Sequence, residues 1–208
     1  MWNFIVKGGP VMIPIILCSF FGLTIIIDKF LFLWSMKMDS SEFVQEIFKD
    51  LKANKPHKAL LLCEKNINYP LAAVIKIGIE RRSLPVERLE KILEQAGNNQ
   101  IQRLEKMLGA LASIIGIEPL LGFLGTITGL IRAFMTWEQA GANITVNALA
   151  LGIYEAMITT AAGLIVAIPF YLCYNYFISR IKYISIDLNN HVVQLLEVLS
   201  ETKLEEKA

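Results

Sequence analysis

The sequence has 208 residues, of which 54% are hydrophobic, and its formal net charge is +1. Ordinary globular domains are roughly 45–50% apolar, so the excess is modest, but charge is nearly absent from three stretches of the chain. A net charge close to zero gives no overall field that would attract nucleic acid. The cysteines are scattered without a CxxC pair and the two histidines lie far apart, which argues against a disulfide framework and a metal site. These features favour a membrane protein with a water-soluble insert.

The first apolar stretch is Val11–Trp34. A helix needs about 20 apolar residues to cross a bilayer, so this stretch is long enough to span it. It is too long for the core of a secretory signal and no A-x-A cleavage pattern follows it, so we expect a retained transmembrane helix. Near its end, Lys29 is expected to snorkel to the interface, and Asp28 to pair with it or to face protein.

Residues 37–106 have a different character, because charges of both signs recur every few positions. Phe43, Ile47 and Leu51 share one helical face, which indicates an amphipathic helix. Further short helices are predicted over 57–66 and 71–82, and another begins after Pro85. Since no Gly or Pro terminates that last helix before Leu108, we expect it to continue directly into the next apolar stretch.

Two more apolar stretches follow, Met107–Trp137 and Val146–Ile178, and both are rich in small residues. In the second stretch, Gly122, Gly125 and Gly129 are spaced to allow a neighbouring membrane helix to approach closely. The third stretch is longer than a bilayer requires and contains Pro169, a predicted kink. Its helical pattern then continues to Leu199, so we expect its end to project into water.

The distribution of Lys and Arg predicts the topology. The insert and the segment after Ser179 hold most of the positive charges, whereas the connector Glu138–Asn147 holds none. The positive-inside rule therefore places the insert and the C-terminus in the cytoplasm and the N-terminus outside. The expected fold is all-α, with three long transmembrane helices that extend into a cytoplasmic helical domain. Its segments are the N-terminal end and first helix (1–36), the insert (37–106), the second helix (107–137), the connector (138–146), the third helix (147–178) and the C-terminal helix and tail (179–208).

Glu155 is the most informative residue, because it lies well inside the third apolar stretch. An ionisable group in a membrane helix is costly and is expected to face the bundle interior or a wet path. Burial disfavours the charged form of a carboxyl, which suits reversible protonation. Thr159 and Thr160 lie about one turn further along, and Thr126 of the second stretch falls at a similar depth. These four residues are the candidate lining of an ion path.

Two simpler interpretations compete with this hypothesis. Threonine in a membrane helix commonly hydrogen-bonds its own backbone, so Thr126, Thr159 and Thr160 taken singly fit a packing role. Arg132 is expected either to pair with Glu155, which would weaken the case for Glu155 as a proton carrier, or to snorkel outward.

The second and third apolar stretches together resemble a known family. Glu118–Phe134 is similar to the second-helix signature of the ExbB/TolQ/MotA proton-channel family, and Gly152–Phe177 is similar to its third helix. Asp28 and Lys29 resemble an acid–base pair near the inner end of the family's first helix. The order of one helix, a large insert and two long helices also matches, so the resemblance spans nearly the whole chain.

The resemblance implies a bacterial inner-membrane motor subunit that forms a homo-pentamer in lipid around two copies of an ExbD/TolR-like single-helix protein. The transported ion would usually be a proton, with sodium left open by the sequence, and no cofactor would be needed. The motor would do work across the envelope, with TonB-dependent import and a TonB-like protein among the expectations. By motif position, Thr126, Glu155 and Thr160 match the family's polar pore residues, and Pro119 opens its second-helix motif. Glu118 and Arg132 depart from the pattern. Glu118 would lie at the inner mouth of the pore or pair with a basic insert residue, and Arg132 would meet the partner.

Two other classes of function stay open on the sequence. A membrane scaffold or assembly subunit would keep the same topology and would explain the small residues by packing alone. A membrane enzyme would need a nucleophile or a metal cluster, and no such constellation is visible: the glycines between Gly122 and Gly129 lack the lysine of a phosphate-binding loop. The sequence therefore predicts a protein that is not an enzyme.

Overall fold

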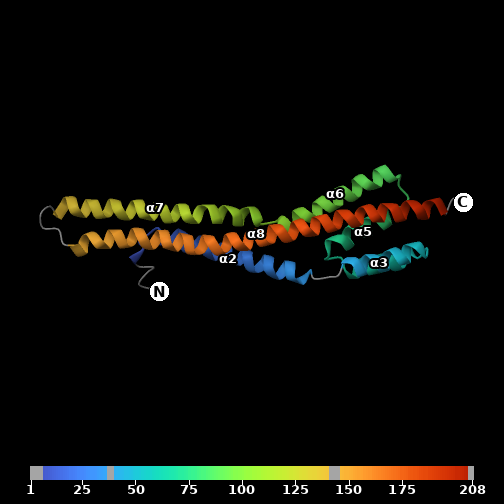
Figure 1. Cartoon of the computed structure of the whole chain (residues 1–208), viewed down its shortest axis with the longest axis horizontal. Coiled ribbons are helices and arrows are strands. Elements are labelled where there is room, and N and C mark those ends of the chain that lie inside the picture. Colours follow the sequence, from blue (N-terminus) through green and yellow to red (C-terminus); the bar gives the residue numbers. More distant parts are fainter. Residues whose placement is uncertain (1–6, 37–39, 141–145, 206–208) are drawn as a thin grey trace. The chain divides into compact units, whose positions relative to one another are not determined.

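The computed structural model describes residues 7–36, 40–140 and 146–205, and within these ranges the regular structure is α-helical (Figure 1). No strand occurs in the described part of the chain, which confirms the predicted all-α class. The helices are α2 (Met12–Ser35), α3 (Ser40–Lys52), α4 (Pro56–Lys65), α5 (Pro70–Glu80), α6 (Val86–Glu105), α7 (Leu108–Ala140) and α8 (Val146–Glu205).

Three of the helical segments are long and apolar enough to cross a membrane, as predicted. Their most apolar windows have mean hydropathies of 2.1 in α2 and 1.9 in both α7 and α8. Large apolar side chains such as Phe20, Phe123 and Ile165 are exposed on these helices, 61–71% of their surface being accessible. Exposed apolar side chains of this size on a helix fit contact with lipid rather than water.

The chain divides into two compact units, and the first comprises residues 1–30 and 107–177. Within it, α7 and the N-terminal part of α8 lie side by side and antiparallel (Figure 1). Helix α2 packs closely against the same part of α8: a Cβ added at Gly22 would lie 2.2 Å from the Phe170 ring. Small residues therefore set the separation of the helices in this unit, as expected for packing in lipid.

The second unit comprises residues 31–106 and 178–208. Its short helices α3–α6 pack on the C-terminal part of α8. The side chain of Leu195 in α8 packs directly against Gly78 of α5, where a Cβ would lie 2.7 Å from it. Pro56 and Pro70 stand at the first turns of α4 and α5, where the missing N–H costs nothing. The core consists of aliphatic side chains that are almost fully buried, among them Ile47, Leu71, Ile75, Ile79, Leu89, Leu93, Leu188 and Leu195.

Three details differ from the sequence-based expectations. α6 ends at Glu105 and does not continue into α7, because Lys106 is extended (φ −48°, ψ 135°) and Met107 adopts a left-handed φ of 69°. A left-handed conformation is unfavourable for a residue with a Cβ and is usually adopted by glycine. Because Met107 occupies this position, no glycine marks the break in the sequence. In the first unit Lys29 is buried rather than snorkelling, whereas Asp28 is exposed. α7 extends to Ala140, and the remainder of the predicted connector up to 145 lies outside the described residues.

Candidate functional site

The contact between α7 and α8 is made by glycines. A Cβ added at Gly122 would lie 2.9 Å from the carbonyl oxygen of Thr159, and one at Gly129 would lie 2.8 Å from the backbone nitrogen of Ala156. Gly125 faces the side chain of Thr159 at 2.3 Å by the same measure. Because no larger residue fits at these positions without a shift, the glycines bring backbone carbonyls within reach of threonine side chains on the other helix.

Thr126 of α7 and Thr160 of α8 meet at this contact, and their hydroxyl groups are hydrogen-bonded to each other. Both hydroxyls also reach the same two carbonyl oxygens. Thr160 Oγ1 lies 3.1 Å from the oxygen of Gly122 and 3.2 Å from that of Ala156, and Thr126 Oγ1 lies 3.3 Å and 3.2 Å from them. Two donors and two carbonyls thus form one compact polar cluster between the helices.

The Thr126–Thr160 cluster forms part of the wall of an open groove of about 520 Å³. The other lining residues are mostly apolar, so the two hydroxyls are isolated polar groups on an otherwise hydrophobic surface. The lining residues are Phe123, Thr126, Ala156, Met157, Thr160, Ala161 and Leu164. A hydrophobic groove with polar groups at fixed places is suited to an apolar helix that carries a single polar or ionisable side chain.

Thr159 has a different environment from Thr160. Its side chain is fully buried, and its hydroxyl lies 3.0 Å from the carbonyl oxygens of both Glu155 and Ala156 in its own helix. This is the backbone hydrogen bond that threonine commonly makes in helices. Thr159 packs against Gly125 and is not among the residues that line the groove.

Glu155 is nearly buried, with 9% of its surface accessible, and it forms an ion pair with Arg132 of α7. One nitrogen of the guanidinium, Nη1, donates to Oε1 at 2.7 Å and to Oε2 at 3.0 Å. Gly9 covers the other side of the carboxylate: it has a φ of 69°, and a Cβ there would lie 2.0 Å from Oε1. The positive φ and the close approach both require glycine, and the sequence reasoning missed this residue, whose only signal is the Gly8-Gly9-Pro10 turn before α2.

The four residues predicted to form one polar stripe are therefore divided between two places. Thr126 and Thr160 face the groove, whereas Glu155 and Thr159 are enclosed. The division follows from helix geometry, because five residues correspond to about 140° of rotation and turn Thr160 away from Glu155.

Glu118, one residue before Pro119, is fully buried in the first unit. Its Oε1 lies 3.2 Å from the hydroxyl of Ser19 in α2, and its backbone carbonyl lies against Gly163 of α8. It thus contacts both neighbouring helices. The sequence reasoning singled out Glu118 but not Ser19, which is an ordinary small polar residue in an apolar run.

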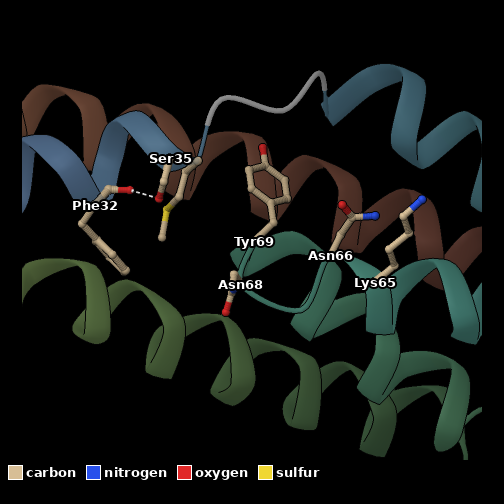
Figure 2. Close-up of a pocket in the computed structure, with 7 residues that line it drawn as sticks. Phe32, Ser35, Lys65, Asn66, Asn68 and Tyr69 are labelled. Carbon is tan, nitrogen blue, oxygen red and sulfur yellow. Dashed lines mark hydrogen bonds between the residues drawn. The ribbon is translucent and has the colours of Figure 1, made fainter.

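A second hollow, of about 510 Å³, lies in the second unit and is more polar (Figure 2). Phe32 and Ser35 come from the end of α2 and Met36 follows it; Lys65 ends α4, and Asn66, Asn68 and Tyr69 belong to the turn before α5. The Ser35 hydroxyl donates to the carbonyl oxygen of Phe32 at 2.8 Å. Burial raises the pKa of the Tyr69 phenol, and the nearby Asp187 carboxylate raises this pKa further. The sequence reasoning did not identify this hollow. Within the described residues, no group of His, Cys, Asp and Glu is arranged to hold a metal ion.

Comparison with known proteins decides the family. Residues 66–190, which include α5 to α7 and most of α8, match the MotA/TolQ/ExbB proton channel family. The chain belongs to this family. The resemblance noted in Glu118–Phe134 and Gly152–Phe177 is thereby confirmed, and the protein is a membrane protein of a proton-channel family rather than of an enzyme family.

Individual relatives agree with the assignment to the MotA/TolQ/ExbB family. An ExbB-like biopolymer transport protein of Synechocystis is 33% identical over 164 residues, which are 78% of this chain and 64% of the relative. The Tol-Pal system protein TolQ of Haemophilus influenzae is 34% identical over 52% of this chain and 47% of its own length. The biopolymer transport protein ExbB of Neisseria gonorrhoeae is 36% identical over 52% and 49%, respectively. The chain thus spans less than two thirds of each of these relatives.

Proposed function

We propose that this chain is the proton-conducting subunit of a bacterial inner-membrane motor. It would assemble as a pentamer around two copies of a single-helix partner of the ExbD/TolR type and would convert the proton motive force into work across the envelope, with TonB-dependent import as one such process. The N-terminus would lie in the periplasm and the C-terminus in the cytoplasm. A transmembrane potential supplies about 2.3 kcal/mol per charge per 100 mV, which is sufficient to bias a rotation between positions of similar energy.

The observation that carries the proposal is the groove containing the Thr126–Thr160 cluster. It lies on helices long enough to cross a membrane, it is apolar except for two hydroxyls, and it is open to a neighbouring helix. Hydroxyl oxygens that already donate to carbonyl acceptors retain lone pairs that can accept a hydrogen bond from a carboxylic acid on a partner helix. An Asp on that helix would be the ion carrier that meets Thr160.

Glu155 has a second role in this proposal. Its ion pair with Arg132 fixes a carboxylate about five residues from the cluster on the same helix, and the exposed half of the Arg132 side chain leaves guanidinium N–H groups for a partner. A partner carboxylate that approached Arg132 would compete with Glu155 and release it for protonation. The threonine cluster and the ion pair would then be two successive stations on the proton route.

Proton flux into proteoliposomes that contain this protein and the partner encoded by a neighbouring gene tests the proposal. Thr160→Val removes the groove hydroxyl with little change of shape and is expected to abolish partner-dependent flux, as is Glu155→Gln. Thr24→Val is the matched control, because Thr24 is an exposed threonine of α2 whose hydroxyl donates to its own helix at Phe20. A scaffold or assembly subunit would give no flux even in the wild type, and that result would refute the proposal.

A further inference from the structure

The route proposed above does not use Glu118, although this residue is the most deeply buried acidic group in the described part of the chain. None of its surface is accessible, its side chain contacts Ser19 of α2, and its backbone carbonyl lies against Gly163 of α8. Its Oε2 has no hydrogen-bond partner among the described residues. An ionised carboxylate in such a place would be strongly unfavourable, because charge burial is tolerated only with a counter-charge or a full set of hydrogen bonds.

The hydrogen atoms available at this place indicate which form of Glu118 is present. The Ser19 hydroxyl has one proton, and it lies 2.7 Å from the carbonyl oxygen of Ile15 but 3.2 Å from Oε1 of Glu118. The Ser19 proton is shared between these two acceptors, of which the Ile15 carbonyl is the closer. A carboxylate at Glu118 would therefore accept at most one long, shared hydrogen bond at Oε1 and none at Oε2. A neutral carboxylic acid at Glu118 avoids the buried charge and can also donate its own proton to the Ser19 oxygen.

We propose that Glu118 is a second proton-binding carboxyl of this chain, held protonated by Ser19 between α2, α7 and α8, and that exchange of its proton is a step of the transport cycle. The second part rests on the proposed function. On α2 the residue next to Ser19 is Cys18, whose thiol is the titratable group at this place. On α8 the opposing residue is Gly163, which contributes no side chain.

The position of Glu118 along α7 connects it to the site described above. Glu118, Gly122 and Gly129 lie on the face of α7 that packs against α8. Glu118 is one turn from Gly122, whose carbonyl accepts from Thr160, and about 20 Å of helix rise separates it from Arg132. The two buried carboxyls, Glu118 and Glu155, therefore stand on either side of the threonine cluster. Since the Ser19 contact holds the proton, movement of α2 away from α7 would be the event that releases it.

Infrared difference spectroscopy of the complete protein in lipid tests the protonation directly, because neutral carboxyls absorb apart from carboxylates. Glu118→Gln keeps the shape and a hydrogen-bond donor, and it is expected to remove one protonated-carboxyl band at neutral pH. Ser19→Ala should keep that band but shift it to the frequency of a less hydrogen-bonded acid. Glu155→Gln, the control, should leave the band in place. If Glu118→Gln instead removes carboxylate absorption, or leaves the protonated band unchanged, the proposed proton-binding site does not exist.

Flux measurements test the role in transport. Glu118→Gln cannot exchange a proton at this position and is expected to slow partner-dependent proton flux by roughly tenfold or more, while its thermal stability stays close to that of the wild type. Unchanged flux in this variant would overturn the transport role. Absence of flux in the wild type would refute the proposed function instead, and the infrared band would still report whether Glu118 binds a proton.

Discussion

A single guanidinium nitrogen of Arg132 donates to both carboxylate oxygens of Glu155, at 2.7 Å and 3.0 Å. The pair joins α7 to α8 near the end of their contact, where Gly9 closes over the carboxylate. The arginine side chain is half exposed and the glutamate side chain only 11% exposed. Arg132 therefore retains access to other groups, whereas Glu155 depends on Arg132 for its counter-charge.

The first prediction concerns the removal of this counter-charge. Arg132→Ala should lower the free energy of unfolding by about 1–2 kcal/mol, because it leaves a nearly buried carboxylate unpaired. The loss is smaller than for a fully buried pair because water screens the half-exposed Arg132 side chain. Thermal unfolding of the purified protein in detergent measures the change.

The double variant Arg132→Ala/Glu155→Gln provides the control for the first prediction. Removing the charge of Glu155 takes away the reason for the loss, so the double variant should be more stable than Arg132→Ala alone. Strictly additive losses in the two single variants and the double variant would show that the ion pair does not contribute to stability in the way described here.

The second prediction concerns the close approach of α7 and α8. Gly122→Ala should destabilise the protein by about 1–3 kcal/mol, because its Cβ would lie 2.9 Å from the Thr159 carbonyl oxygen and 3.0 Å from the Thr160 Cα. Gly116→Ala, on the same helix with nothing within 4 Å of the added Cβ, is the matched control and should be neutral or slightly stabilising. Equal effects of the two substitutions on the unfolding temperature would contradict glycine-mediated packing.

The contrast between Gly122 and Gly116 illustrates what the sequence could predict. The spacing of Gly122, Gly125 and Gly129 within an apolar stretch indicated a packed face, and the structure places all three against α8. Local patterns of this kind are visible in a sequence because helical periodicity alone decides which residues share a face.

Other features depended on tertiary contacts and were not predictable. The break between α6 and α7 relies on Met107 in a left-handed conformation, which its residue type does not favour. The sequence left open whether Arg132 pairs with Glu155, meets a partner protein or snorkels outward. Only the fold shows that it pairs with Glu155. The separation of Thr159 from Thr160 depends on the rotation of α8 about its axis, which a sequence fixes only when the neighbouring helix is known.

The third prediction uses this separation of two adjacent threonines. Thr159→Val should retain at least most of the wild-type proton flux and lose less than about 1 kcal/mol of stability, because the lost hydroxyl bonds only to its own helix. Thr126→Val should strongly reduce flux, because it removes half of the hydroxyl pair in the groove. Partner-dependent flux in proteoliposomes distinguishes the two. If Thr159→Val lost flux and Thr126→Val did not, Thr159 would belong to the proton pathway and Thr126 to helix packing, the opposite of this prediction.

The fourth prediction concerns the core of the second unit, where the side chain of Cys63 is completely buried. Burial raises the pKa of its thiol from the ordinary value near 9.0 to about 12. In a Cys18→Ala/Cys173→Ala background, a maleimide reagent should therefore label Cys63 very slowly at pH 8, because the thiolate is the reactive form and the thiol is inaccessible. Denaturant should restore rapid labelling, and rapid labelling of the folded protein would contradict the packing described here.

The same shift in the pKa of Cys63 predicts how stability depends on pH. Below pH 9 the thiol is neutral in both the folded and the unfolded chain, so its contribution is fully present. Between pH 9 and about 12 the unfolded chain loses the proton and the folded chain keeps it, so the free energy of unfolding falls with rising pH. The maximum loss is about 4 kcal/mol. Cys63→Ala removes this term, and chemical unfolding of both proteins across this pH range should show a steeper decline for the wild type. Parallel declines would mean that the thiol ionises equally in both states and that the core around Cys63 admits water.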